Sequence, residues 1–221
     1  MTTKKSYYTF AYFLAVALYF CFINKLSFPF NVLLKIIPIL ILIAFVYNIK
    51  LTISNPRQLI VALSLCLLGD LILTLPGELS IKLGIFFFSL AHFAYIGCFI
   101  KKGLVRKKRI LVFLPFLFLI LINFYFLFPY FSTLKLPVIG YILILTALMF
   151  FGLQLRESYI TIGLGCFFFL VSDFNLALNE FVSPSERLRF LTLFFYYLSQ
   201  LLLVAGLCNL NKAKWRILKK G

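Results

Sequence analysis

Long apolar runs separated by short polar segments dominate this sequence of 221 residues, of which 63% are hydrophobic. Only 13% of the residues are charged, which leaves too little polar surface to cover a water-soluble globule of this size. A run of about 20 apolar residues is long enough to cross the hydrocarbon core of a bilayer as a helix. The sequence therefore predicts an all-α fold, a polytopic bundle of membrane helices.

Eight runs are predicted to be transmembrane helices, and together they form a single integral membrane domain over residues 1–221. The runs cover residues 7–23, 31–48, 58–75, 82–100, 109–128, 136–153, 159–178 and 189–210. No small-residue cleavage site follows the first run, so we interpret it as an uncleaved span and not as a signal peptide.

The net charge of +16 is distributed unevenly between the two sides of this arrangement. Sixteen of the 22 lysines and arginines lie in the termini and in the connections on the same side, and six lie on the other side. By the positive-inside rule, both termini are predicted to be cytoplasmic, in a multi-pass protein of the cell membrane. Anionic headgroups account for the basic segments, so we expect membrane lipid and no nucleic acid as a partner.

The five cysteines have no C-x-x-C spacing, which argues against a metal site.

Two aspartates, Asp70 and Asp173, lie inside predicted spans. An ionisable residue inside a span costs several kcal/mol and normally faces other helices or a wet cavity. At 1.5 Å per residue, Asp70 is about 18 Å and Asp173 about 21 Å from the inner end of its run, which places both in the outer half of the membrane. Residues 67–75 also align with residues 170–178 so that the aspartates coincide. This match predicts a four-plus-four internal repeat, although chance matching of leucines remains the alternative.

Further polar side chains are predicted at a similar depth. His92 and Tyr95 lie one turn apart on the fourth run, and Tyr197 and Gln200 lie one turn apart on the eighth. A lone buried histidine is more often structural than catalytic. Lys35 lies near the outer start of the second run, where it is either a snorkelling lysine or a counter-ion for a carboxylate or phosphate.

This convergence of polar residues indicates acid/base chemistry on a lipid. Two nearby desolvated carboxyls cannot both ionise easily, so one can act as the acid while the other acts as the base. A proton-coupled or lipid-type membrane transporter that uses the same carboxylates is the main alternative. An intramembrane aspartyl protease is a weaker alternative, because this chain lacks the residues expected around the two aspartates of such an enzyme. A non-catalytic lipid-binding scaffold is a further alternative, and it would tolerate neutralisation of either carboxyl.

Several short segments, in order along most of the chain, carry a resemblance to a known family. They are Gly69-Asp70, Ala91-His92-Phe93-Ala94-Tyr95, Tyr141 with Met149, Ser172-Asp173, and Tyr197 with Gln200. On these residues the chain resembles the YhhN-like family of integral membrane proteins, whose characterised members are lysoplasmalogenases. The family commonly has lysine directly followed by proline in the second helix, whereas here two isoleucines separate Lys35 from Pro38.

The resemblance implies an ether hydrolase that needs no cofactor and no metal. Such an enzyme cleaves the vinyl-ether bond of a lysoplasmalogen, which is a lysophospholipid, into a fatty aldehyde and a glycerophosphoethanolamine or glycerophosphocholine. Asp70 and Asp173 are the expected catalytic residues, one as proton donor and the other as base, with the assignment between them open. The other polar residues named above are expected to bind or orient the substrate: Lys35, His92, Tyr95, Tyr197 and Gln200.

Overall fold

The computed structural model describes residues 2–23, 25–26, 28–49, 56–100, 106–155 and 158–218, and within these ranges it describes side chains from residue 6 to residue 208. The described residues form α-helices and one 3₁₀-helix (η2), and no strand occurs among them. In chain order these are α1 (Thr2–Phe22), α2 (Phe30–Asn48), α3 (Pro56–Ile72), α4 (Glu78–Ile100), α5 (Lys107–Leu127), η2 (Phe128–Leu134), α6 (Lys135–Gln154), α7 (Tyr159–Phe181) and α8 (Glu186–Leu218).

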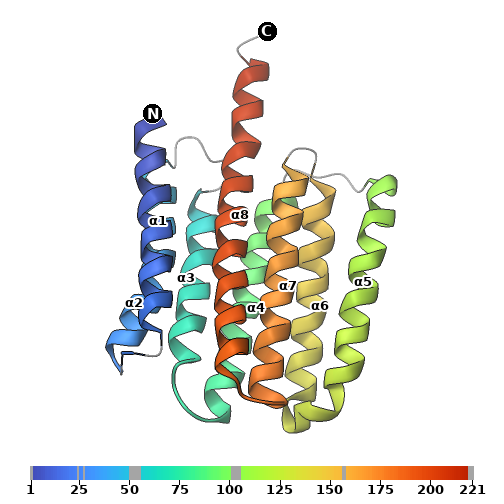
Figure 1. Ribbon diagram of the computed structural model, residues 1–221. Coiled ribbons are helices and arrows are strands. Elements are labelled where there is room, and N and C mark those ends of the chain that lie inside the picture. The colour runs from blue at the N-terminus through green and yellow to red at the C-terminus, as the bar shows by residue number, and fades with distance from the viewer. Residues whose placement is uncertain are drawn as a thin grey trace.

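The helices run up and down side by side, and α1 begins at the same end of the bundle at which α8 ends (Figure 1). Consecutive helices pack on one another from α1 to α4 and from α5 to α8, and α4 also packs on α6, which joins the two halves. Figure 1 shows α5 at one edge of the bundle, where it packs on α6 and α7. Because consecutive antiparallel helices are neighbours in any such bundle, this arrangement does not test the predicted repeat.

Five described stretches are long and apolar enough to cross a membrane: Phe30–Asn48, Glu78–Ile100, Lys107–Gln154, Tyr159–Phe181 and Glu186–Cys208. The third stretch is α5, η2 and α6 together, and the chain turns back on itself at η2 (Figure 1). The helix over Ser6–Phe22 is apolar but shorter. The molecule is therefore an all-helical, multi-pass membrane protein, while eight crossings and a four-plus-four repeat remain predictions.

Each predicted run coincides with a helix, with differences at the ends. The third helix ends at Ile72 and not at residue 75, because the chain turns at Leu73 and Thr74. The fourth begins at Glu78, four residues before the apolar run, and Glu78 and Leu79 in its first turn are exposed. Six residues that contribute to the predicted charge asymmetry lie outside the described residues: Lys50, Lys101, Lys102, Arg156, Lys219 and Lys220.

Close helix packing brings α3 and α4 together beside the first aspartate. A Cβ atom added to Gly69 would lie only 2.7 Å from Cε2 of Phe88 on α4. Only glycine therefore lets the Phe88 ring rest against the backbone of α3 at this point. The ring is itself nearly buried, at 7% exposure, and it forms part of the wall of the site described next.

Candidate functional site

A polar cavity of about 280 Å³ lies at the end of the bundle opposite the start of α1 and the end of α8. Residues of α2, α3, α7 and α8 supply its charged and polar side chains, and Tyr19 of α1 and Phe88 of α4 complete the wall. Both aspartates line it, together with a lysine, an arginine and a glutamate. The charged lining residues are Lys35, Asp70, Asp173, Glu180 and Arg189.

Asp70 forms an ion pair with Lys35 across the α2–α3 interface. The lysine Nζ lies 3.2 Å from Oδ1 of Asp70 and also donates a hydrogen bond of 3.1 Å to the main-chain carbonyl oxygen of the same residue. Both side chains are largely buried, at 13% exposure for Lys35 and 4% for Asp70. Of the two roles predicted for Lys35, the structure therefore shows the counter-ion, whose double contact also fixes the position of the carboxyl.

The second oxygen of the Asp70 carboxyl, Oδ2, is buried and has no hydrogen-bond partner among the described residues. Tyr196, on α8, lines the same cavity, and its buried hydroxyl lies near this carboxyl without a hydrogen bond of ordinary geometry. Buried polar atoms are normally hydrogen-bonded, so unpartnered ones at a cavity wall mark where a water or a ligand would bind. Lys35 therefore contacts one side of the Asp70 carboxyl, and the other side faces Tyr196 and the polar cavity.

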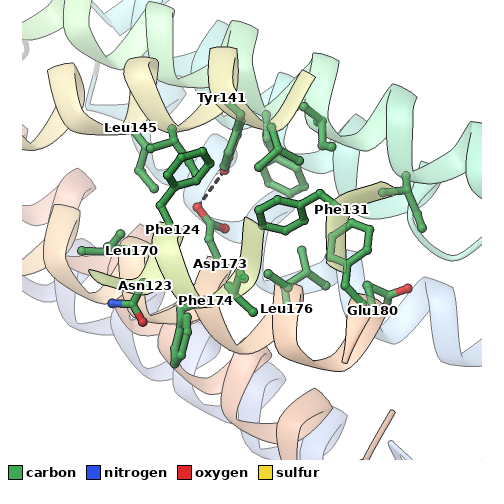
Figure 2. Close-up of a pocket in the computed structure, with 18 of the residues that line it drawn as sticks. Asn123, Phe124, Phe131, Tyr141, Leu145, Leu170, Asp173, Phe174, Leu176 and Glu180 are labelled. Carbon is green, nitrogen blue, oxygen red and sulfur yellow. Dashed lines mark hydrogen bonds between the residues drawn. The ribbon is translucent and has the colours of Figure 1, made fainter. Parts of the chain in front are cut away.

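Asp173 has a different partner and a different surrounding. The hydroxyl of Tyr141, on α6, donates a hydrogen bond of 2.7 Å to its Oδ2 (Figure 2). Apart from this phenol, its neighbours in the close-up are largely hydrocarbon, including Phe124, Leu145 and Leu170. The two carboxyls thus share one cavity but differ in environment: one faces an ammonium group and the other a neutral phenol at an apolar wall.

Tyr197 contacts the main chain of Lys35 and not its ammonium group. Its hydroxyl donates a hydrogen bond of 2.7 Å to the main-chain carbonyl oxygen of Lys35, and the Tyr197 carbonyl accepts one of 2.6 Å from the hydroxyl of Tyr12. These bonds tie α1, α2 and α8 together at the base of the lysine. Tyr197 does not line the polar cavity, so its contact with the site passes through Lys35.

Tyr95 and Gln200 form a separate buried link. The Tyr95 hydroxyl donates a hydrogen bond of 2.6 Å to Oε1 of Gln200, whose Nε2 donates one of 3.2 Å to Sγ of Cys66. Cys66 lies one turn before Asp70 on α3. The link therefore joins α4, α8 and α3 one turn deeper in the bundle than the carboxyl. Neither Tyr95 nor Gln200 is among the described residues that line the polar cavity.

His92 is fully buried, and both of its ring nitrogens lack a hydrogen-bond partner among the described residues. Its ring packs edge-on against Phe169, with ring centroids 4.5 Å apart, and lies 5.3 Å from the Tyr141 ring. The histidine therefore contacts the residue that holds Asp173, and an orienting role for His92 would act through Tyr141.

Three further residues emerge only from the structure as parts of the site or its rim. Tyr141 belongs to the segments that carry the family resemblance, but its sequence position gives no sign that it contacts Asp173. Glu180 and Arg189 lie near the facing ends of α7 and α8, are exposed, and line the mouth of the polar cavity. Their signal in the sequence is weak, because charged residues between two spans are usually only topological markers.

No group of three histidine, cysteine, aspartate or glutamate side chains that could hold a metal ion occurs in the part of the chain that the structure describes. The chemistry available at the polar cavity is proton transfer between carboxyls, phenols and water, with an ammonium and a guanidinium group to bind anions.

Comparison with known proteins agrees with the resemblance seen in the sequence. The sequence model of the YhhN family matches residues 30–207. A relative from Rattus norvegicus, "Lysoplasmalogenase TMEM86B", is 32% identical over 177 residues, which cover 78% of this chain and 71% of the rat protein. No solved structure matches the chain. The matched residues include both aspartates and every helix that lines the polar cavity except α1.

Proposed function

Because the chain belongs to the YhhN family, we propose that it is a lysoplasmalogenase, a hydrolase that cleaves the vinyl-ether bond of a lysoplasmalogen. The products are a fatty aldehyde and a glycerophosphoethanolamine or glycerophosphocholine. One observation carries the proposal beyond similarity: Asp70 and Asp173 line the same polar cavity in different environments. A pair of carboxyls with different surroundings is what acid/base catalysis needs.

The surroundings favour Asp173 as the proton donor and Asp70 as the base. An ammonium group at 3.2 Å favours the ionised form of the Asp70 carboxyl. Asp173 accepts a hydrogen bond from the neutral Tyr141 and borders hydrocarbon, where an uncharged carboxylic acid is easier to accommodate than a carboxylate. We therefore assign the acid to α7 and the base to α3.

The reaction starts with transfer of the Asp173 proton to the vinyl carbon that is not bonded to oxygen. The π electrons form the new C–H bond, and a lone pair on the ether oxygen stabilises the cation as an oxocarbenium ion. The Asp70 carboxylate stabilises this positive charge and takes a proton from the water that attacks the cationic carbon. The product of this step is a hemiacetal.

The hemiacetal then collapses and both carboxyls return to their starting forms. Its hydroxyl proton passes to the Asp173 carboxylate, the bond between the former vinyl carbon and the glycerol oxygen breaks, and Asp70 returns its proton to that oxygen. The aldehyde and the glycerol hydroxyl leave. Lys35 keeps Asp70 in place throughout, since its ammonium contacts both the carboxyl and the main chain of this residue.

The charges at the mouth of the cavity suit a zwitterionic headgroup. Arg189 can bind the phosphate through its guanidinium group, and Glu180 can bind the positively charged ammonium group of ethanolamine or choline. Both side chains line the polar cavity. In this arrangement the headgroup lies at the exposed rim and the glycerol lies between it and the aspartates.

We also propose that the polar cavity opens toward the outer side of the cell membrane, because the sequence predicts sixteen of the 22 basic residues on the side of the termini. Green fluorescent protein fused to the C-terminus should fluoresce, and alkaline phosphatase at the same place should be inactive. The reverse pattern would invert the orientation.

The activity itself is tested with purified protein and three lysolipids that share one chain and one headgroup but differ in the linkage: vinyl ether, alkyl ether and acyl ester. The proposal expects aldehyde from the vinyl ether alone. Release of fatty acid from the ester, without aldehyde from the vinyl ether, would make the protein a lysophospholipase. No turnover of any of the three would refute a hydrolase and favour transport.

A further inference from the structure

A second cavity, of about 110 Å³, lies beside the polar one, between α4, α5, η2, α6 and α7. Aliphatic and aromatic side chains make up nearly all of its lining, including Phe124, Phe131 and Phe174 around Asp173 (Figure 2). The few polar lining residues lie next to the polar cavity or at the rim. This apolar cavity therefore resembles a binding site for hydrocarbon more than a binding site for water or ions.

The two cavities share a wall. Leu73, Phe88, Asp173, Leu176 and Glu180 line both of them. Of the two carboxyls among them, Glu180 is exposed at the rim, whereas Asp173 is partly buried where the polar and the apolar cavity meet. A lysolipid has the same division, since a charged headgroup and glycerol are joined through one linkage to one hydrocarbon chain.

We infer that the apolar cavity binds the hydrocarbon chain of the lysolipid, with the linkage between chain and glycerol placed at Asp173. This inference rests on the proposed function for the identity of the linkage. With the headgroup in the polar cavity and the chain in the apolar one, the first carbons of the chain lie next to the Asp173 carboxyl. These are the vinyl carbons, one of which must receive the proton.

The length of the apolar cavity along α7 agrees with that of one chain. The lining residues of α7 extend from Leu170 to Phe181, which is about 16 Å along the helix axis at 1.5 Å per residue. One leaflet of the hydrocarbon core is about 15 Å deep, and this is the depth that a lipid chain fills. The cavity is also bordered by α5 at the edge of the bundle, where a chain could enter directly from the bilayer.

Ala177 offers a way to fill this cavity without touching the polar groups, because its side chain lines the apolar cavity and does not line the polar one. Ala177→Leu adds three carbon atoms to the wall. Ala17, on the exposed face of α1, allows the same substitution away from both cavities, so Ala17→Leu is the matched control. Phe174→Ala makes the opposite change, since it enlarges the apolar cavity.

The test uses a lysolipid with an alkyl-ether chain that carries a photoreactive diazirine near its end, so that labelling does not depend on turnover. In the wild-type protein the label should map to peptides that contain Phe124 or Phe131. Ala177→Leu should lower this labelling about tenfold, while Ala17→Leu should leave it unchanged. A label confined to other helices, or labelling of these peptides that is insensitive to Ala177→Leu, would overturn the inference.

Turnover of vinyl-ether lysolipids of different chain length separates the inference from the proposed function. Ala177→Leu should lose activity on long chains and keep it on short ones, and Phe174→Ala should shift the preference toward longer chains. If both variants keep the wild-type chain preference, the apolar cavity is not the chain site, although the proposed function stands. If the wild type labels as expected but releases no aldehyde, the proposed function fails and the cavity remains a lysolipid-chain site.

Discussion

The ion pair between Lys35 and Asp70 should stabilise the fold as a coupled unit. At an effective dielectric constant of about 20, opposite charges 3.2 Å apart attract each other by about 5 kcal/mol before the cost of desolvation. Removing one partner of a buried pair leaves the other charge uncompensated, which typically costs about 3–5 kcal/mol. We therefore expect Lys35→Met and Asp70→Asn each to destabilise the protein by about 3–5 kcal/mol, and the double variant to be destabilised by far less than the sum.

Thermal unfolding in detergent can measure this coupling directly. Four of the five cysteines are buried, so a maleimide dye that fluoresces on reaction with thiols reports their exposure on unfolding. At roughly 2–4 °C per kcal/mol for a chain of this size, each single variant should lose roughly 6–20 °C in Tm. The double variant should recover much of that loss while remaining inactive, because Asp70 is the proposed base.

The pair between Lys82 and Glu78 is the matched control. Its nitrogen and oxygen are closer, at 2.8 Å, but both side chains are about half exposed. Exposed pairs contribute little, because water screens them and side-chain entropy opposes them. Glu78→Gln should therefore leave Tm nearly unchanged. Additive losses for Lys35→Met and Asp70→Asn, with no recovery in the double variant, would refute the reasoning that the two charges stabilise the fold through each other.

Three further predictions concern the packing around the site. Tyr141→Phe removes the donor to Asp173 and should lower kcat by about 10–100-fold, or about 1.4–2.7 kcal/mol, with the fold intact by circular dichroism; wild-type kcat would show that this hydrogen bond has no catalytic role. Gly69→Ala should lower Tm by the equivalent of about 1–3 kcal/mol because the added Cβ clashes with a ring of α4, whereas Gly140→Ala, which has open space around it, should not; equal Tm for both would contradict the packing argument. His92→Phe removes two unpartnered ring nitrogens, so Tm should stay close to the wild-type value and kcat should stay within about tenfold of the wild-type kcat. Complete inactivation would show that the imidazole takes a direct part in the chemistry.

The sequence predicts the helices well because their signal is local. All eight apolar runs coincide with helices, since a run of this length and composition has few alternatives in a membrane. The unusual cost of a charge in a span also points to Asp70 and Asp173, and both line one cavity. Lys35 lines it too, although the sequence leaves a snorkelling role open for this residue.

The partners of these residues could not be predicted, because they depend on how each helix is rotated about its axis. Several helices here are apolar on all sides, so the sequence carries no face pattern that would show which neighbour a side chain meets. The hydrogen bond from Tyr141 to Asp173 is one consequence, and the apolar cavity next to Asp173 is another. Tyr95 and Gln200 were predicted to belong to the site only because of their depth in the membrane. In the structure they are hydrogen-bonded to each other, deeper in the bundle than the polar cavity.

Proton transfer from Asp173 to carbon is the central claim, and hydrolysis of a vinyl-ether lysolipid in deuterated water tests it most directly. The aldehyde released by the wild type should carry one deuterium on the carbon next to its carbonyl group. Asp173→Asn should lower the rate of this release by about 10²–10⁴-fold, while Glu78→Gln, a carboxyl neutralised away from both cavities, should match the wild type. Aldehyde without that deuterium, or an Asp173→Asn variant as active as Glu78→Gln, would contradict the mechanism.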